Sequence, residues 1–118
     1  MKFLCIVYGE ERILDAMSKA EMERLDSDSM GYDRELERSG HLIVAQALQS
    51  VQTATCIRIR DDQVDILDGP FAETKEQLLG FVMIDARDKN EAIEIAKKIP
   101  LARLGTIEVR PIMKLGED

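Results

Sequence analysis

Residues 78–100, LLGFVMIDARDKNEAIEIAKKIP, decide the fold because they join a buried strand to a capped helix. The run LLGFVMIDA (78–86) is apolar almost throughout, as in a strand covered on both faces. Asp88 follows as a helix N-cap, and Pro100 ends the helix. The apolar residues of this helix recur at the i, i+3, i+4, i+7 spacing of a single buried stripe; they are Ala92, Ile95, Ala96 and Ile99.

A second strand–helix unit opens the chain. KFLCIVY (2–8) is a continuous apolar strand. Ser18 and Glu21 fit a capping box, in which each side chain satisfies a free backbone donor at the helix start. We expect a helix over residues 18–39, with Gly40 as its C-terminal cap. Its apolar stripe consists of Met22, Leu25, Tyr32 and Leu36. Gly31 interrupts the helix at a cost of about 1 kcal/mol relative to Ala.

A hairpin is predicted between these two units. HLIVAQALQ (41–49) and TATCIRIR (53–60) are strand-like, DDQ (61–63) is a turn, and VDIL (64–67) returns as a short strand. Ile57 and Ile59 alternate with Arg58 and Arg60, which predicts a strand with one solvated face.

The last strand, TIEVRPIM (106–113), completes the order β-α-β-(ββ)-β-α-β. Two split β-α-β halves with an inserted hairpin predict an α+β, ferredoxin-like antiparallel sheet with both helices on one face. The opposite face would then remain uncovered although two of its strands are apolar on both sides. Because soluble proteins avoid large exposed apolar patches, we expect two sheets to pack together in a homodimer.

Length and charge exclude several classes of protein. The 118 residues predict a single domain, 1–118, and the formal net charge of −7 argues against nucleic-acid and anionic-membrane partners. No apolar run approaches the roughly 20 residues that span a bilayer, and no signal peptide is evident, so a cytoplasmic location is expected.

Cys5 and Cys56 are far apart in apolar runs and are interpreted as buried, reduced thiols. With one His, no metal site and no cofactor are predicted.

DGPFAETKEQLLGF (68–81) resembles the signature of the DGPF-domain family, a branch of the YCII-related proteins. KFLCIVYG (2–9) and IPLARLGTIEVRPI (99–112) resemble the same family, so the resemblance covers almost the whole chain. It implies a dimeric α/β barrel, in which the sheets of two ferredoxin-like protomers pair. Some YCII-related proteins resemble small lyases or dehydrochlorinases with a suspected catalytic His on the first helix. Here that helix contains no His, and His41 lies just beyond it.

The segment 68–76 supplies the first candidate residues. Asp68 begins a rigid turn with Gly69 and Pro70, and its carboxylate is a candidate general base or ligand-binding group. Phe71 is interpreted as a packing plug rather than a substrate platform. Residues 73–76 are interpreted as a solvated charge run that starts a helix, with Thr74 as its N-cap.

The final strand and the helix ends supply the others. Glu108 and Arg110 share one strand face, and if Ile107 and Val109 face the helices, the two charges face the dimer cavity. There they would form a structural ion pair or bind a polar ligand, and both alternatives stay open. Arg103 is a candidate for binding an anion or a surface residue, and His41 is expected to interact with the helix dipole or with a ligand.

Three functions are compatible with these residues. The first is a cofactor-independent, dimeric, small-molecule-binding or regulatory protein with its site in the dimer cavity, where Asp68, Glu108 and Arg110 would converge beside Phe71. The second is a small lyase or isomerase that uses Asp68 as acid or base. The third is a dimer whose role is protein interaction. The sequence names neither the ligand nor the reaction.

Overall fold

The computed structural model describes residues 1–116 of the chain. In chain order the elements are β1 (Lys2–Gly9), α1 (Glu11–Asp15), α2 (Lys19–Arg38), β2 (Leu42–Ala47), the 3-10 helix η1 (Val51–Thr53), β3 (Thr55–Arg60), β4 (Gln63–Asp68), β5 (Gln77–Asp85), α3 (Lys89–Ala96), the 3-10 helix η2 (Pro100–Arg103) and β6 (Thr106–Pro111). None of the described helices has the length and apolar character needed to cross a bilayer.

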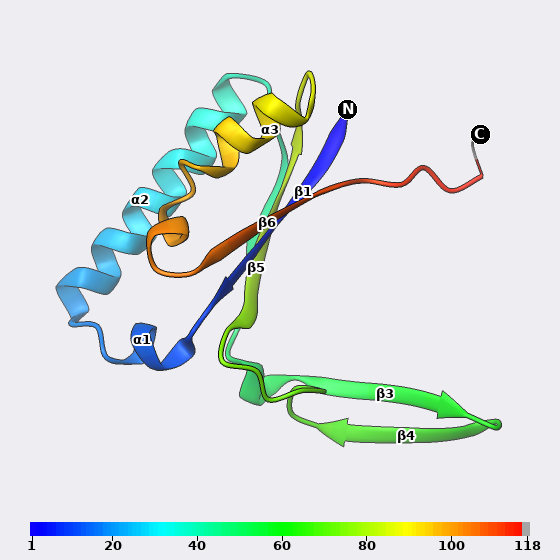
Figure 1. Cartoon of the computed structure of the whole chain (residues 1–118). Helices are drawn as coiled ribbons and strands as arrows, with labels where there is room; N and C mark the ends of the chain where they lie inside the picture. The colour runs from blue at the N-terminus through cyan, green and yellow to red at the C-terminus, as the bar shows by residue number, and fades with distance from the viewer. Residues whose placement is uncertain (117–118) are drawn as a thin grey trace.

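Four strands form the main sheet in the order β2-β5-β1-β6, and every neighbouring pair is antiparallel. The two long helices, α2 and α3, cover one face of this sheet (Figure 1). The chain is therefore an α+β protein of the ferredoxin-like type, as predicted. The two strands with continuous apolar runs, β1 and β5, are the central ones, which explains why they lack a polar face.

The hydrophobic core lies between the sheet and the helices. Phe3, Cys5 and Ile84 are completely buried, and they belong to the alternate positions of β1 and β5 that face the helices. The helices contribute Leu36 from α2 and, from α3, the predicted stripe. That stripe consists of Ala92, Ile95 and Ala96, with Ile99 buried just beyond the helix end.

The ends of α2 follow the sequence signals. The Ser18 hydroxyl accepts a hydrogen bond from the Glu21 N–H at 3.1 Å, and the Glu21 carboxylate accepts one from the Ser18 N–H at 3.1 Å. At the other end Gly40 has a φ of +82°, and the His41 N–H donates to the Leu36 carbonyl at 2.9 Å. Both the capping box and the glycine cap are confirmed.

The hairpin is confirmed, but its predicted environment is wrong. β3 and β4 form a separate two-stranded sheet, which we call the arm (residues 55–68), and it projects from the side of the main sheet opposite the helices (Figure 1). Ile57 and Ile59 are both more than half exposed, so their face of the strand is not covered by residues 1–116. Cys56 is half-buried rather than buried, because its strand lies outside the core.

Two further expectations are corrected. Residues 73–76 form no helix: the Thr74 hydroxyl donates to the Glu76 carbonyl at 2.7 Å within an irregular loop that leads into β5. The α-helix after Asp88 ends at Ala96, and Pro100 begins η2 instead of ending α3. The short helix α1 has no strong apolar period and was not predicted.

Candidate functional site

The predicted charged pair lies on the open face, the face of the main sheet that the helices leave uncovered. In the β1–β6 register Glu108 is opposite Ile6, and Arg110 is opposite Leu4. Ile107 and Val109 pack against the core on the other side. The expectation about the direction of these side chains is confirmed, and their role in binding stays a prediction.

Apolar side chains surround the two charges. The β1–β5 register pairs Leu4 with Met83 and Ile6 with Phe81, so these four share the open face. Leu4, Phe81 and Met83 are only partly buried within one chain. An apolar surface with a few polar groups is the usual composition of a small-molecule site.

Tyr8 joins this surface and was not found from the sequence. Its hydroxyl donates a hydrogen bond to Glu108 Oε1 at 3.0 Å, across 100 positions of the chain. This hydrogen bond to an anion raises the pKa of Tyr8, because ionisation of the phenol would remove the donor. Glu108 is therefore bonded to Tyr8, and the Glu108–Arg110 ion pair is not formed in the described part of the chain. The Arg110 guanidinium makes no hydrogen bond or ion pair with another described residue.

The structure does not bring Asp68 into contact with Glu108 or Arg110. Asp68 ends β4 at the base of the arm, opposite Thr55, with its side chain exposed. The turn after it is firm: Gly69 has a φ of +99°, and its N–H donates to the Ala54 carbonyl at 2.7 Å.

Phe71 is 78% exposed, so it does not act as a packing plug within the described chain, and its role at a site between two copies stays a prediction. The loop that carries it returns to the main sheet near Tyr8. There the Thr106 hydroxyl, opposite Tyr8 in the register, donates to Glu76 Oε1 at 2.8 Å. The DGPFAETKE segment thus links the arm to the end of the open face.

His41 and Arg103 lie in the helix layer, away from the open face. The His41 ring is within 2.7 Å of the Ser39 hydroxyl and 3.2 Å of Glu91 Oε1, so it ties the end of α2 to α3. The Arg87 N–H, the Arg87 charge and His41 lower the pKa of Glu91. These contacts give His41 a structural role between α2 and α3, and its expected interaction with the helix dipole or a ligand stays a prediction.

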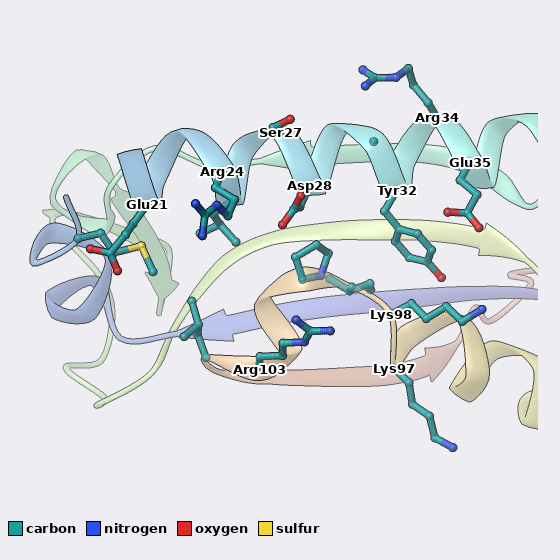
Figure 2. Close-up of a pocket in the computed structure, with 16 residues that line it drawn as sticks. Glu21, Arg24, Ser27, Asp28, Tyr32, Arg34, Glu35, Lys97, Lys98 and Arg103 are labelled. Carbon is teal, nitrogen blue, oxygen red and sulfur yellow. The ribbon is translucent and has the colours of Figure 1, made fainter. Parts of the chain in front are cut away.

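Arg103 lines a groove of about 720 Å³ between α2 and the α3–η2 segment. In Figure 2, Arg24, Asp28 and Arg103 point into the space between α2 and η2, whereas Arg34 points away from it. Gly31 also lines the groove and leaves room there. The open, mixed-charge composition of the groove favours a solvated surface over a selective site.

A second cavity, of about 400 Å³, lies between α2 and the strands β2 and β5. Its walls are mainly apolar, and α2 contributes Asp26, Ser29 and Asp33. Desolvation raises the pKa of Asp33, whose carboxylate makes no hydrogen bond or ion pair with the described residues. Sequence reasoning missed Asp33. The available signal was its position beside Tyr32 and Leu36 on the flank of the apolar stripe.

Known proteins resemble this chain over nearly its full length. A family model described as the YCII-related domain matches residues 1–116. The chain is also 36% identical over 114 residues to "Uncharacterized protein R00369" of Rhizobium meliloti (strain 1021), covering 95% of this chain and 92% of that protein.

Proposed function

The chain belongs to the YCII-related family, and we propose that it is a homodimeric small-molecule-binding protein whose site lies between the open faces of two sheets. The DGPFAETKE segment favours the DGPF branch of that family. The observation that carries the proposal is the combination of apolar surface with the Tyr8–Glu108 hydrogen bond and an Arg110 side chain that has no ion-pair partner among the described residues. No cofactor is part of the proposal.

The composition of the open face supports the dimer. Leu4, Phe81 and Met83 form a contiguous apolar surface on adjacent strands. Two such faces packed about 10 Å apart would bury this surface and leave space only where side chains fail to interdigitate. The polar edge at β6 would then line the remaining cavity.

The polar groups suggest the class of ligand. The guanidinium of Arg110 makes no hydrogen bond or ion pair within residues 1–116, and it suits the two oxygens of a carboxylate or phosphate. Glu108 keeps acceptor capacity beyond its bond from Tyr8 and suits a hydroxyl or amino donor. The arrangement therefore fits a small organic anion that also carries a hydrogen-bond donor, with Asp68 and Phe71 at the rim.

A lyase or isomerase is the second candidate, and one observation favours a different residue for it. Asp68 is exposed, whereas Asp33 combines an apolar cavity with a raised pKa. A carboxyl group that holds its proton closer to neutral pH is suited to general acid–base catalysis. If the protein is an enzyme, Asp33 is the proposed acid or base.

The test is a thermal-shift screen of small metabolites, followed by titration of each hit against matched variants. Arg110→Ala and Tyr8→Phe should weaken binding at least tenfold while sedimentation still shows a dimer. Arg34→Ala, which removes a guanidinium that points away from the groove, is the control and should leave binding unchanged. Hits whose binding is weakened by Asp33→Asn but not by Arg110→Ala would favour the second candidate. A wild-type protein that sediments as a folded monomer at micromolar concentration would refute the dimeric site.

A further inference from the structure

The arm exposes an apolar surface that no described part of its own chain covers. The exposed fractions are 67% for Ile57, 59% for Ile59, 58% for Val64 and 65% for Ile66. The β3–β4 register pairs Ile57 with Ile66 and Ile59 with Val64, so all four belong to one face of the two-stranded sheet. We call these four residues the arm's apolar face.

The other face of the arm is different in character. It carries Arg58 opposite Asp65 and Arg60 opposite Gln63, with Cys56 opposite Leu67 near the base. A hairpin with one β-branched face and one mainly polar face has the alternation of a strand pair that is covered on one side. Because an isolated two-stranded sheet is only marginally stable in water, the ordered arm needs a contact on its apolar face.

The exposed surface of the whole chain, of which the arm is one part, indicates that the chain makes a large contact with a partner. The chain exposes 8860 Å², against about 6,500 Å² for a compact monomer of its mass. Its radius of gyration is 16.3 Å, against about 13.5 Å for a compact domain of this length. An excess of roughly 2,400 Å² per chain matches what each protomer buries in a large, obligate homodimer.

The direction and length of the arm identify the partner. The arm projects from the same side as the open face, and so does the C-terminal segment that carries the exposed Met113 and Leu115 (Figure 1). Each strand of the arm has six residues and so reaches about 20 Å. Two sheets packed face to face lie only about 10 Å apart, so the arm would extend past the sheet of a second copy packed on the open face.

We infer that in the homodimer each arm clasps the second copy of the chain, with Ile57, Ile59, Val64 and Ile66 packed against it. This rests on the proposed face-to-face dimer and adds to it the surface that holds the copies together. Each arm also walls one end of the cavity between the sheets. The site is then incomplete in a single chain, because the partner's arm closes it.

The experiment compares two pairs of substitutions that differ only in the face they alter. Ile57→Thr with Ile66→Thr makes the apolar face polar, and Arg58→Thr with Asp65→Thr changes the opposite face; threonine keeps the strand propensity in both. Sedimentation equilibrium should show the dimer dissociation constant raised about a hundredfold or more by the first pair, because each dimer loses four buried apolar side chains. The second pair should change it less than about threefold.

A direct contact measurement complements this. In mixed dimers of one copy with 13C-labelled isoleucine methyl groups and one unlabelled copy, isotope-filtered NOE spectra should show contacts from Ile57, Ile59 and Ile66 to the unlabelled copy. A wild-type dimer without such contacts, or equal losses from both pairs of substitutions, overturns the clasp and leaves the face-to-face site standing. A wild-type monomer overturns both.

Discussion

Replacing Gly31 by alanine is expected to stabilise the protein by about 0.8–1 kcal/mol. Gly31 is in the interior of α2, where glycine costs about that much relative to alanine because its unfolded backbone has more freedom to lose. Beyond the neighbouring residues and backbone of its own helix, a Cβ at this position would meet no described atom within 4 Å, so no packing penalty offsets the gain. For a chain of this size the melting temperature should rise by roughly 4 °C, compared at equal protein concentration because dimerisation also shifts it.

Gly80→Ala is the matched control with the opposite expected sign. Its Cβ would lie 2.6 Å from the Gln46 carbonyl oxygen and 3.1 Å from the Ala47 Cα, both of which belong to the backbone of β2. Because backbone atoms cannot rotate away, β2 and β5 must separate, at a cost of about 1–3 kcal/mol or more. Urea unfolding of both variants measures the two effects. A Gly31→Ala variant no more stable than the wild type would refute the reasoning.

Four other outcomes are expected. Asp33→Asn should raise the urea midpoint at pH 7 but not at pH 3. The raised pKa of Asp33 favours the folded state below the unfolded pKa of about 3.9, and this contribution is lost as pH rises through the folded pKa. A variant less stable than the wild type at pH 7 would contradict this. Glu91→Gln should lower the urea midpoint at pH 7 but not at pH 3. The lowered pKa of Glu91 stabilises the fold above about pH 4.3, and this stabilisation is lost in acid. Equal midpoints of the variant and the wild type at pH 7 would count against it. Cys5 is fully buried with a pKa raised to about 11, so Ellman's reagent should modify the half-buried Cys56 first, and Cys56→Ser should abolish the native-state reaction. EDTA should leave the circular dichroism spectrum unchanged, because no group of three metal-binding side chains occurs within residues 1–116; a loss of helical signal would refute this.

The arm shows where local patterns stop being informative. The alternation of Ile57 and Ile59 with arginines predicted a strand correctly, and Asp61 and Asp62 form the turn with φ values of +51° and +63°. The same alternation could not say what covers the apolar face. That depends on where the arm points relative to the main sheet, and it points away from the chain's own core.

The sequence predicted part of the candidate site, and the rest needed the tertiary structure. The period of two along a strand placed Glu108 and Arg110 on one face of β6. It could not reveal that Glu108 bonds Tyr8, because their contact depends on the register between strands far apart in the chain. The rigid turn made Asp68 a reasonable candidate site residue. The turn residues alone could not predict that its side chain is exposed to solvent.

The sequence by itself determined the order of the six strands and of α2 and α3, both caps of α2, the N-cap of α3, the central position of β1 and β5, and the family. These follow from short-range preferences and from the burial that continuous apolar strands require. Only the tertiary structure decided that Asp33 is the desolvated carboxylate, that Phe71 is exposed and that the arm leaves the domain. Desolvation, strand register and the direction of a hairpin depend on atoms contributed by distant segments, which no local pattern specifies.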